Sequence, residues 1–316
     1  MKHRRIFLSV VSVIMLGVIS ILTIINIYGK SAKKSSGCSG GGCMGCNGCG
    51  SQGQINSTYY KNKQEQLLDT LEGRQKIFRS ELLKSHTEKE ITEISKETTE
   101  EFIKLIPQLP YIGGDDNVLT EDIELAAMVL AFYRVEKKLG RSVEEVGGII
   151  YNAIKGEMSK YPKWLLRLSG RKYFTATYIE KLKKDTEESQ KKLYSGDWLT
   201  TFVPGDGKQF DYGYNHTECG ILKFFREQDA EELTPFLCKL DYVYSDSLDE
   251  GLVRTSTLAE GGKYCDFRLK RVENDSLDML VAGTAGMIIV SIALTFLFIV
   301  RKILINRKRS ISGLSS

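Results

Sequence analysis

The chain has 316 residues, a formal net charge of +4 and a mean hydropathy of −0.20, which predict a largely globular protein of one or two domains. Eight of its 44 Lys and Arg residues lie at the two ends, where there is no acid, so the middle of the chain is net acidic. This balance excludes a nucleic-acid-binding protein, whose basic surface must offset phosphate charge. Nucleic acid is therefore not an expected partner.

Two uncharged, mostly apolar runs lie near the ends, at residues 6–28 and 279–300. About 20 such residues span a bilayer as a helix. The first run is longer than the core of a signal peptide and lacks a small-x-small cleavage site after it, so we expect an uncleaved anchor. Basic flanks place both termini in the cytoplasm and the main domain outside the cell membrane. The lipid bilayer is thus an expected partner, contacted by two spans.

Between these runs, composition changes several times along the chain. We expect an N-terminal anchor (1–29), a Gly/Cys-rich linker (30–57), an amphipathic helical segment (58–112), an α+β domain (113–273), the second span (279–300) and a basic cytoplasmic tail (301–316).

The linker spaces four cysteines as C-x4-C-x2-C-x2-C, at Cys38, Cys43, Cys46 and Cys49. Pairs two residues apart can clamp zinc or an iron–sulfur cluster. The alternative is a flexible, low-complexity segment whose thiols are oxidised, lipidated or idle. Both interpretations stay open.

Hydrophobic periodicity predicts helices through the first half of the main domain. Residues 58–107 favour one or two amphipathic helices that end near Pro107 and Pro110. Further helices are expected over Thr120–Leu139, with Gly140 as a stop, and over Ser142–Lys160. Their expected role is scaffold packing.

After Tyr194 the pattern changes to strands and turns. Residues 198–203 and 210–214 predict a hairpin turned at Gly205–Gly207, and 252–258 and 264–270 a second one turned at Gly261-Gly262. Between them we expect two helices, the first capped by Asn215 with Glu218 three residues on, and the second beginning at Thr234 with Pro235. The order ββααββ after a helical half predicts an α+β fold with an antiparallel sheet.

The two central helices carry the first candidate site residues. Asp241 borders the apolar arc of its helix, where a carboxylate is costly unless it is paired. It is either a structural partner of a nearby base or a site residue. Cys219 lies near a helix N-terminus, which favours the thiolate, so it is a candidate nucleophile or else a small buried hydrophobe. His216 beside it is the one histidine placed for acid–base work.

The last predicted strand adds a third cysteine. Alternation puts Cys265, Phe267 and Leu269 on one face and Asp266 and Arg268 on the other. Three thiolates from Cys219, Cys238 and Cys265 are candidate ligands of a metal ion, although the sequence requires no cofactor. One disulfide plus a free thiol is the alternative outside the membrane.

Three stretches carry a family resemblance: NHTECG at 215–220, ELTPFLCKLD at 232–241, and TLAEGG at 257–262 followed by CDFR at 265–268. Over residues 115–271 the chain resembles the L-2-amino-thiazoline-4-carboxylic acid hydrolases. The Gly-Gly…Cys-Asp-Phe ending is also similar to ligand-binding domains of the vinyl-reductase type. The resemblance implies hydrolytic opening of a cyclic amidine, a small-molecule substrate, to a carbamoyl-cysteine.

That reaction needs an activated water and an acid for the leaving atom. Asp241 or Glu260 is the candidate base, His216 the proton shuttle, and Arg268 or Arg254 the group that holds the substrate carboxylate. Direct attack by Cys219 is the alternative chemistry. A membrane-anchored sensing or binding module without turnover, and a metal-binding protein, are the competing functions.

Overall fold

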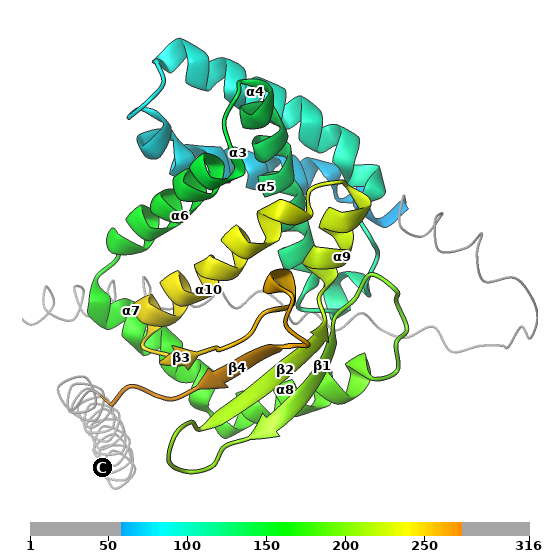
Figure 1. Cartoon of the computed structure of the whole chain (residues 1–316), viewed down its shortest axis with the longest axis vertical. Helices are drawn as coiled ribbons and strands as arrows, with labels where there is room; N and C mark the ends of the chain where they lie inside the picture. Colours follow the sequence, from blue (N-terminus) through cyan, green and yellow to red (C-terminus); the bar gives the residue numbers. More distant parts are fainter. Residues whose placement is uncertain (1–57, 274–316) are drawn as a thin grey trace, which may run out of the picture. The chain divides into compact units, whose positions relative to one another are not determined.

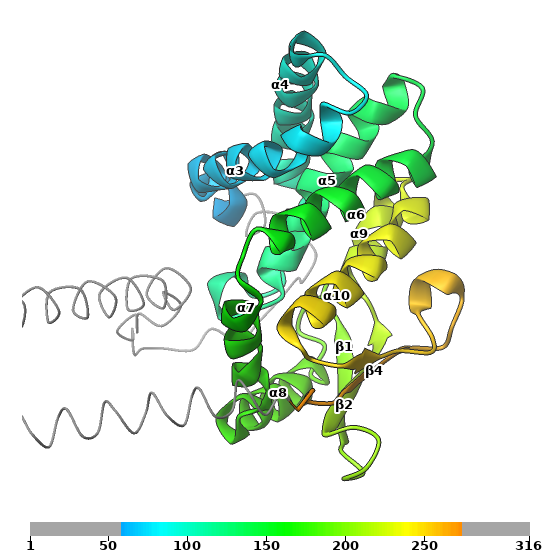
Figure 2. The same cartoon turned by 90° about the vertical axis from the view of Figure 1, so that its left-hand side faces the viewer.

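The computed structural model describes residues 58–273, which form a helical part followed by a small sheet with its own helices (Figures 1 and 2). No helix in this range combines the length and apolarity needed to cross a bilayer. The expected spans at 6–28 and 279–300 and the Cys38–Cys49 cluster lie outside the described residues.

The helical part is built around one enclosed helix. It comprises α3 (Gln64–Leu82), α4 (Glu88–Leu105), α5 (Thr120–Lys138) and α6 (Val143–Ser159). The sequence LAAMVLAFY makes α5 apolar on every side, and such a helix is stable only when it is surrounded. It packs against α4, α6 and α9 accordingly. The predicted helices over 120–139 and 142–160 are confirmed, the second with a Ser142–Glu145 capping box.

Two helices between the halves were not predicted from the sequence. These are α7 (Lys163–Gly170) and α8 (Ala176–Ser189), separated by a short 3₁₀ turn. The helix α8 covers the sheet with Tyr178, Ile179 and Leu182. The helix α7 has only eight residues, and α8 has few apolar positions among its lysines and acids, so neither carries a long hydrophobic repeat.

The sheet has four antiparallel strands in the order β1-β2-β4-β3. Its elements, with the two helices between the strand pairs, are β1 (Leu199–Pro204), β2 (Tyr212–Glu218), α9 (Gly220–Glu227), α10 (Thr234–Leu248), β3 (Leu252–Val253) and β4 (Cys265–Leu269). The predicted order ββααββ and the α+β class are therefore confirmed. The helix α10 lies between α6 and the sheet (Figures 1 and 2).

Two local predictions were wrong. Asn215 does not cap a helix: β2 continues to Glu218, and Cys219 is the N-cap of α9. The strand prevails because β1 and β4 pair with it on both sides, which outweighs a local capping pattern. The second hairpin is also looser than predicted, since β3 holds only two residues and a 3₁₀ turn at Leu258–Glu260 follows.

The two glycines of that turn serve different purposes. Gly261 has φ of +84°, as predicted, whereas Gly262 is not in the positive-φ region. Gly262 is needed for space instead, because a Cβ there would lie 2.0 Å from Ser256 Oγ.

Candidate functional site

The face of the sheet turned towards α8 and α10 carries the polar and aromatic side chains of the candidate site. Strand register places Tyr214 opposite Phe267 and His216 opposite Cys265. Tyr214 stacks on Phe267 with ring centroids 4.7 Å apart, and His216 meets Phe267 edge-on at 5.3 Å. The alternation predicted for β4 is thus confirmed, with Cys265 and Phe267 sharing this face.

An ion pair between Asp241 and Arg254 lies at the centre of the site. Arg254 Nη1 donates to Asp241 Oδ2 at 2.5 Å, and Nη2 donates to the carbonyl of Cys238 at 2.7 Å. The guanidinium also lies 4.8 Å from the Phe267 ring centroid. Its side chain is 3% exposed, whereas that of Asp241 is 41% exposed. The base is therefore fixed inside the protein and the acid is presented to solvent.

Each group of the pair keeps an unused polar atom. Arg254 Nε is buried without a hydrogen-bond partner. Among the residues that the structure describes, Asp241 Oδ1 makes no hydrogen bond, since Oδ2 takes the arginine. Burial raises the pKa of Asp241, and Arg254 opposes that rise. A carboxylate held by one oxygen with the other directed to solvent is arranged to accept a proton or a hydrogen bond.

Two further acids lie close enough to feel the charge of Asp241. Burial raises the pKa of Asp122, on α5, to about 7, and Asp241 adds to the shift. Burial likewise raises the pKa of Glu250 to about 7, with Lys172 opposing and Asp241 adding. Asp122 is exposed and Glu250 partly exposed, so both combine solvent contact with strong desolvation. Each of the two acids is therefore easier to protonate than a free carboxyl group.

We use the name Asp241 recess for the cluster of side chains whose charges or rings interact with the ion pair. They are Asp122, Tyr214, His216, Cys219, Cys238, Asp241, Glu250, Arg254, Cys265 and Phe267.

His216 is neutral in this environment. Burial lowers its pKa to about 4, and the positive charge of Arg254 contributes. Its Nδ1 is 2.8 Å from the hydroxyl of Thr200 on β1. This contact orients the ring and leaves Nε2 as the nitrogen available to a ligand.

The three cysteines border the recess as thiols. Burial raises the pKa of Cys219 to about 11 and that of Cys238 to about 12, and it also raises that of Cys265. At Cys219 the backbone N–H groups of Leu222 and Ile221 act against the shift but do not reverse it. The expectation of a thiolate at this helix N-terminus is therefore not met, because desolvation outweighs the helix end.

A metal site from these cysteines is not formed either. Within residues 58–273, no three His, Cys, Asp or Glu side chains are grouped to hold a metal ion. Cys265 Sγ instead accepts the backbone N–H of Leu258 at 3.2 Å. The three-thiolate prediction therefore finds no support in this part of the chain, although the three thiols lie close enough to raise one another's pKa.

Two other predicted site residues lie away from the recess. Arg268 is on the opposite face of the sheet, where Nη1 donates to Asn215 Oδ1 at 2.9 Å. Asp266 on that face accepts hydrogen bonds from Thr255 and Ser256, so the two do not pair. Glu260 is exposed in the 3₁₀ turn and accepts from Thr257 Oγ1 at 2.7 Å. The hydrogen bonds of Arg268 and Glu260 are thus structural, and neither residue lies at the recess.

Sequence reasoning missed Asp122, Tyr214 and Glu250. Asp122 lies in the first turn of the helix expected over Thr120–Leu139, where an acidic residue is ordinary. Tyr214 alternates with His216, a signal that the mistaken helix cap at Asn215 concealed. Glu250 comes directly after α10, and nothing in its sequence context indicates burial.

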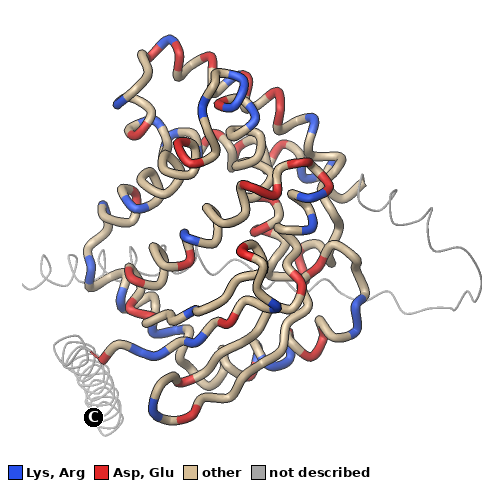
Figure 3. Tube along the Cα trace, viewed as in Figure 1, with Lys and Arg blue, Asp and Glu red and all other residues tan. Residues whose placement is uncertain are grey.

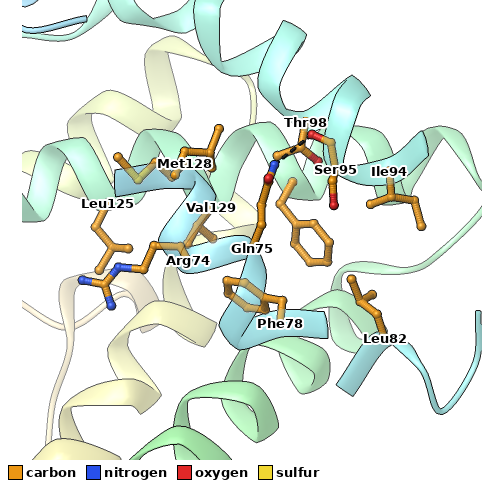
Figure 4. A pocket seen from close by; sticks show the side chains of 12 residues that line it. Arg74, Gln75, Phe78, Leu82, Ile94, Ser95, Thr98, Leu125, Met128 and Val129 are labelled. Atoms are coloured by element: carbon orange, nitrogen blue, oxygen red, sulfur yellow. Dashed lines mark hydrogen bonds between the residues drawn. The ribbon is translucent and has the colours of Figure 1, made fainter. Parts of the chain in front are cut away.

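A separate small cavity lies in the helical part, between α3, α4 and α5 (Figure 4). It holds about 20 Å³, enough for a water molecule but not for a larger ligand. Gln75 spans it and donates to the carbonyl of Ser95 at 2.8 Å. Thr98 Oγ1 on its wall is buried without a hydrogen-bond partner, which is consistent with a bound water.

The fold is an α+β domain in which a buried arginine holds a partly exposed carboxylate. Residues 121–269 match the family model described as L-2-amino-thiazoline-4-carboxylic acid hydrolase. The match confirms the resemblance noted from the sequence over this part of the chain. No curated protein and no solved structure matches the chain.

Proposed function

We propose that the protein is a membrane-anchored hydrolase that opens the ring of a small cyclic amidine and releases a carbamoyl-cysteine-type product. The family match over residues 121–269 supports a hydrolase-like function. The observation that carries the assignment to the recess is the Asp241 carboxylate, with Oδ2 held by a buried arginine and Oδ1 left to solvent.

Asp241 is the proposed general base. Water adds to the amidine carbon of a protonated ring, the C=N electron pair moves to the ring nitrogen, and Oδ1 takes one proton from the water. The tetrahedral carbon then collapses: its hydroxyl loses a proton to solvent as C=O forms, and the ring C–S or C–N bond breaks. Asp241 returns its proton to the leaving sulfur or nitrogen, which restores the carboxylate.

The charges of the recess favour the cationic end of such a substrate. The three acids Asp122, Glu250 and Asp241 face two bases, the buried Arg254 and, at Glu250, Lys172; the pKa values of Asp122 and Glu250 are near 7. A protonated amidine supplies the missing positive charge. His216 stays neutral, so its role is to orient the substrate or relay a proton.

The test is ring opening of L-2-amino-thiazoline-4-carboxylate by the purified full chain, followed as the mass gain of one water. Asp241→Asn keeps an oxygen for Arg254 but removes the base, so turnover per folded molecule should fall about 10²-fold or more. Asp246→Asn, an exposed change on the same helix, is the matched control. Undiminished turnover in Asp241→Asn would exclude the proposed base.

A binding module without turnover is the second candidate, favoured by the protonated state of Cys219 and Cys238 and the neutral state of His216. A ligand would then raise the unfolding midpoint of the wild type without any product. Asp241→Asn would weaken that shift, because the anion that attracts the amidine is lost.

Membrane anchoring is proposed from the apolar runs at 6–28 and 279–300 and their basic flanks. A reporter fused after Ser316 should be cytoplasmic, and one inserted at Ser51–Gln54 should be outside. A cytoplasmic linker reporter would overturn the two-span topology.

A further inference from the structure

The helix α7 exposes large apolar side chains to solvent. Trp164 and Leu168, four residues apart on one side of the helix, are 51% and 40% exposed, and Tyr161 just before it is 41% exposed. Scattered apolar residues are common on protein surfaces, but here three lie within eight residues. Tryptophan and tyrosine beside a leucine are typical of a membrane–water interface, where the ring is apolar and its edge polar.

The same segment is the most one-sided in charge within the main domain. Residues 158–179 contain no acid, although the middle of the chain is net acidic. Their bases are Lys160, Lys163, Arg167, Arg171 and Lys172. The Lys and Arg positions of this segment are blue in Figure 3. Among the described residues, Lys163 and Lys172 have no ion-pair partner within 4.0 Å.

The chain leaves the described domain beside this helix. Arg167 Nε lies 2.8 Å from Asp249 Oδ2, and the N–H of Val272 donates to the carbonyl of Asp249 at 3.3 Å. Gly170 packs so closely on Leu248 that a Cβ there would lie 1.9 Å from the Leu248 carbonyl oxygen. The helix α7, the end of α10 and residues 271–273 therefore form one fixed surface, which we call the α7 surface.

The apolar run at 279–300 begins six residues after Glu273. Six residues span at most about 20 Å. A bilayer entered by that run must then lie within about 20 Å of the α7 surface. Of the candidate occupants, a lipid surface matches both features, since its headgroups take the bases and its interface takes Trp164 and Leu168.

We propose that the α7 surface docks on the bilayer, with Trp164 and Leu168 inserted at the interface and Lys163 and Lys172 against anionic headgroups. The contact fixes how the domain lies on the membrane. It uses the membrane anchoring proposed above, but it does not depend on the hydrolysis.

Tryptophan fluorescence of the full chain in vesicles tests this contact. The chain has two tryptophans, Trp164 and the buried Trp198, so the wild-type spectrum minus that of Trp164→Phe reports Trp164 alone. In phosphatidylcholine–phosphatidylglycerol vesicles with brominated acyl chains, Trp164 emission should shift to the blue and be quenched. The paired change Lys163→Glu and Lys172→Glu should reduce the quenching at least about twofold, since each base contributes near the surface. Lys89→Glu, an exposed change on α4, should not.

The outcomes separate the docking from the anchoring. If the protein floats with the vesicles but Trp164 is unquenched and accessible to iodide, the docking is overturned and the anchoring stands. If the blue shift of Trp164 emission depends on the density of protein in the vesicles and not on the brominated chains, a second copy covers the α7 surface. That result also overturns the docking. A chain that does not float with vesicles overturns the anchoring and the docking together.

Discussion

Two ion pairs in this protein use the same chemistry with opposite exposure. At the end of α5, Glu136 is 0% exposed and its partner Arg141, 2.7 Å away, is 21% exposed. At α10, Arg254 is 3% exposed and its partner Asp241 is 41% exposed. In the first pair the acid is enclosed and the base reaches solvent, and in the second the base is enclosed and the acid reaches solvent.

The difference separates a structural pair from the pair that we propose to be reactive. Arg141 also donates to Ser85 Oγ, and His86 lies 3.9 Å from Glu136, so this pair ties the loop after α3 to the end of α5. No ligand reaches the enclosed carboxylate. Asp241, by contrast, is held at one oxygen and accessible at the other. We propose the Asp241 pair as the site because its carboxylate is exposed, whereas that of Glu136 is enclosed.

The largest expected loss of stability follows from Asp241→Ala. It leaves the buried Arg254 without a counter-ion, and a guanidinium cannot escape by losing its proton. Breaking a buried pair in this way costs about 3–5 kcal/mol of unfolding free energy, measurable by urea denaturation. Asp246→Ala on the same helix is the control. A loss no larger than that of the control would show that water hydrates Arg254, and would weaken the comparison.

Arg141→Ala should cost less, about 2–3 kcal/mol near pH 8. The stranded Glu136 can take up a proton, and burial already raises its pKa in the wild type. When folding raises the pKa of a carboxyl group, the protein loses stability as pH rises above the pKa of that group in the unfolded state. The destabilisation by Arg141→Ala should therefore shrink towards pH 5. Turnover per folded molecule should be unchanged. If the destabilisation by Arg141→Ala did not depend on pH, protonation of Glu136 would not explain it.

Arg268→Ala should have a smaller effect, about 1 kcal/mol, from its hydrogen bond to Asn215. Arg268 was predicted to hold the substrate carboxylate, yet it lies on the sheet face opposite His216. Substrate KM should therefore stay within about twofold of the wild type, as expected for surface changes. A large rise in KM in a folded variant would indicate that the substrate binds on the face of the sheet that carries Arg268.

Much of the fold could be predicted because its signals are local. The apolar run of α5, the Ser142–Glu145 capping box and the alternation of Cys265 and Phe267 each specify an element within a few residues. The site could not be predicted in full, since it depends on contacts between distant segments. Arg254 was only one of two candidate arginines. The strand that carries His216 was mistaken for a helix start, because its pairing with β1 and β4 is not visible locally.

The last effect, from Asp122→Asn, has the opposite sign to the others, and solvent screening at this exposed residue makes it smaller than the pKa shift alone implies. Folding raises the pKa of Asp122 from 3.8 to about 7, through burial first and the charge of Asp241 second. The folded state therefore binds this proton more tightly than the unfolded state, and wild-type stability falls as pH rises from about 4 to about 7. Asparagine removes that loss, so the variant should unfold at a higher temperature than the wild type at pH 8 and at nearly the same temperature at pH 4. Asp246→Asn, the exposed control on α10, should keep the pH dependence of the wild type. The same variant should bind a cationic amidine more weakly, because the recess has lost one of its acids. A variant less stable than the wild type at pH 8 would mean that Asp122 is paired in solution and that the recess is not short of positive charge.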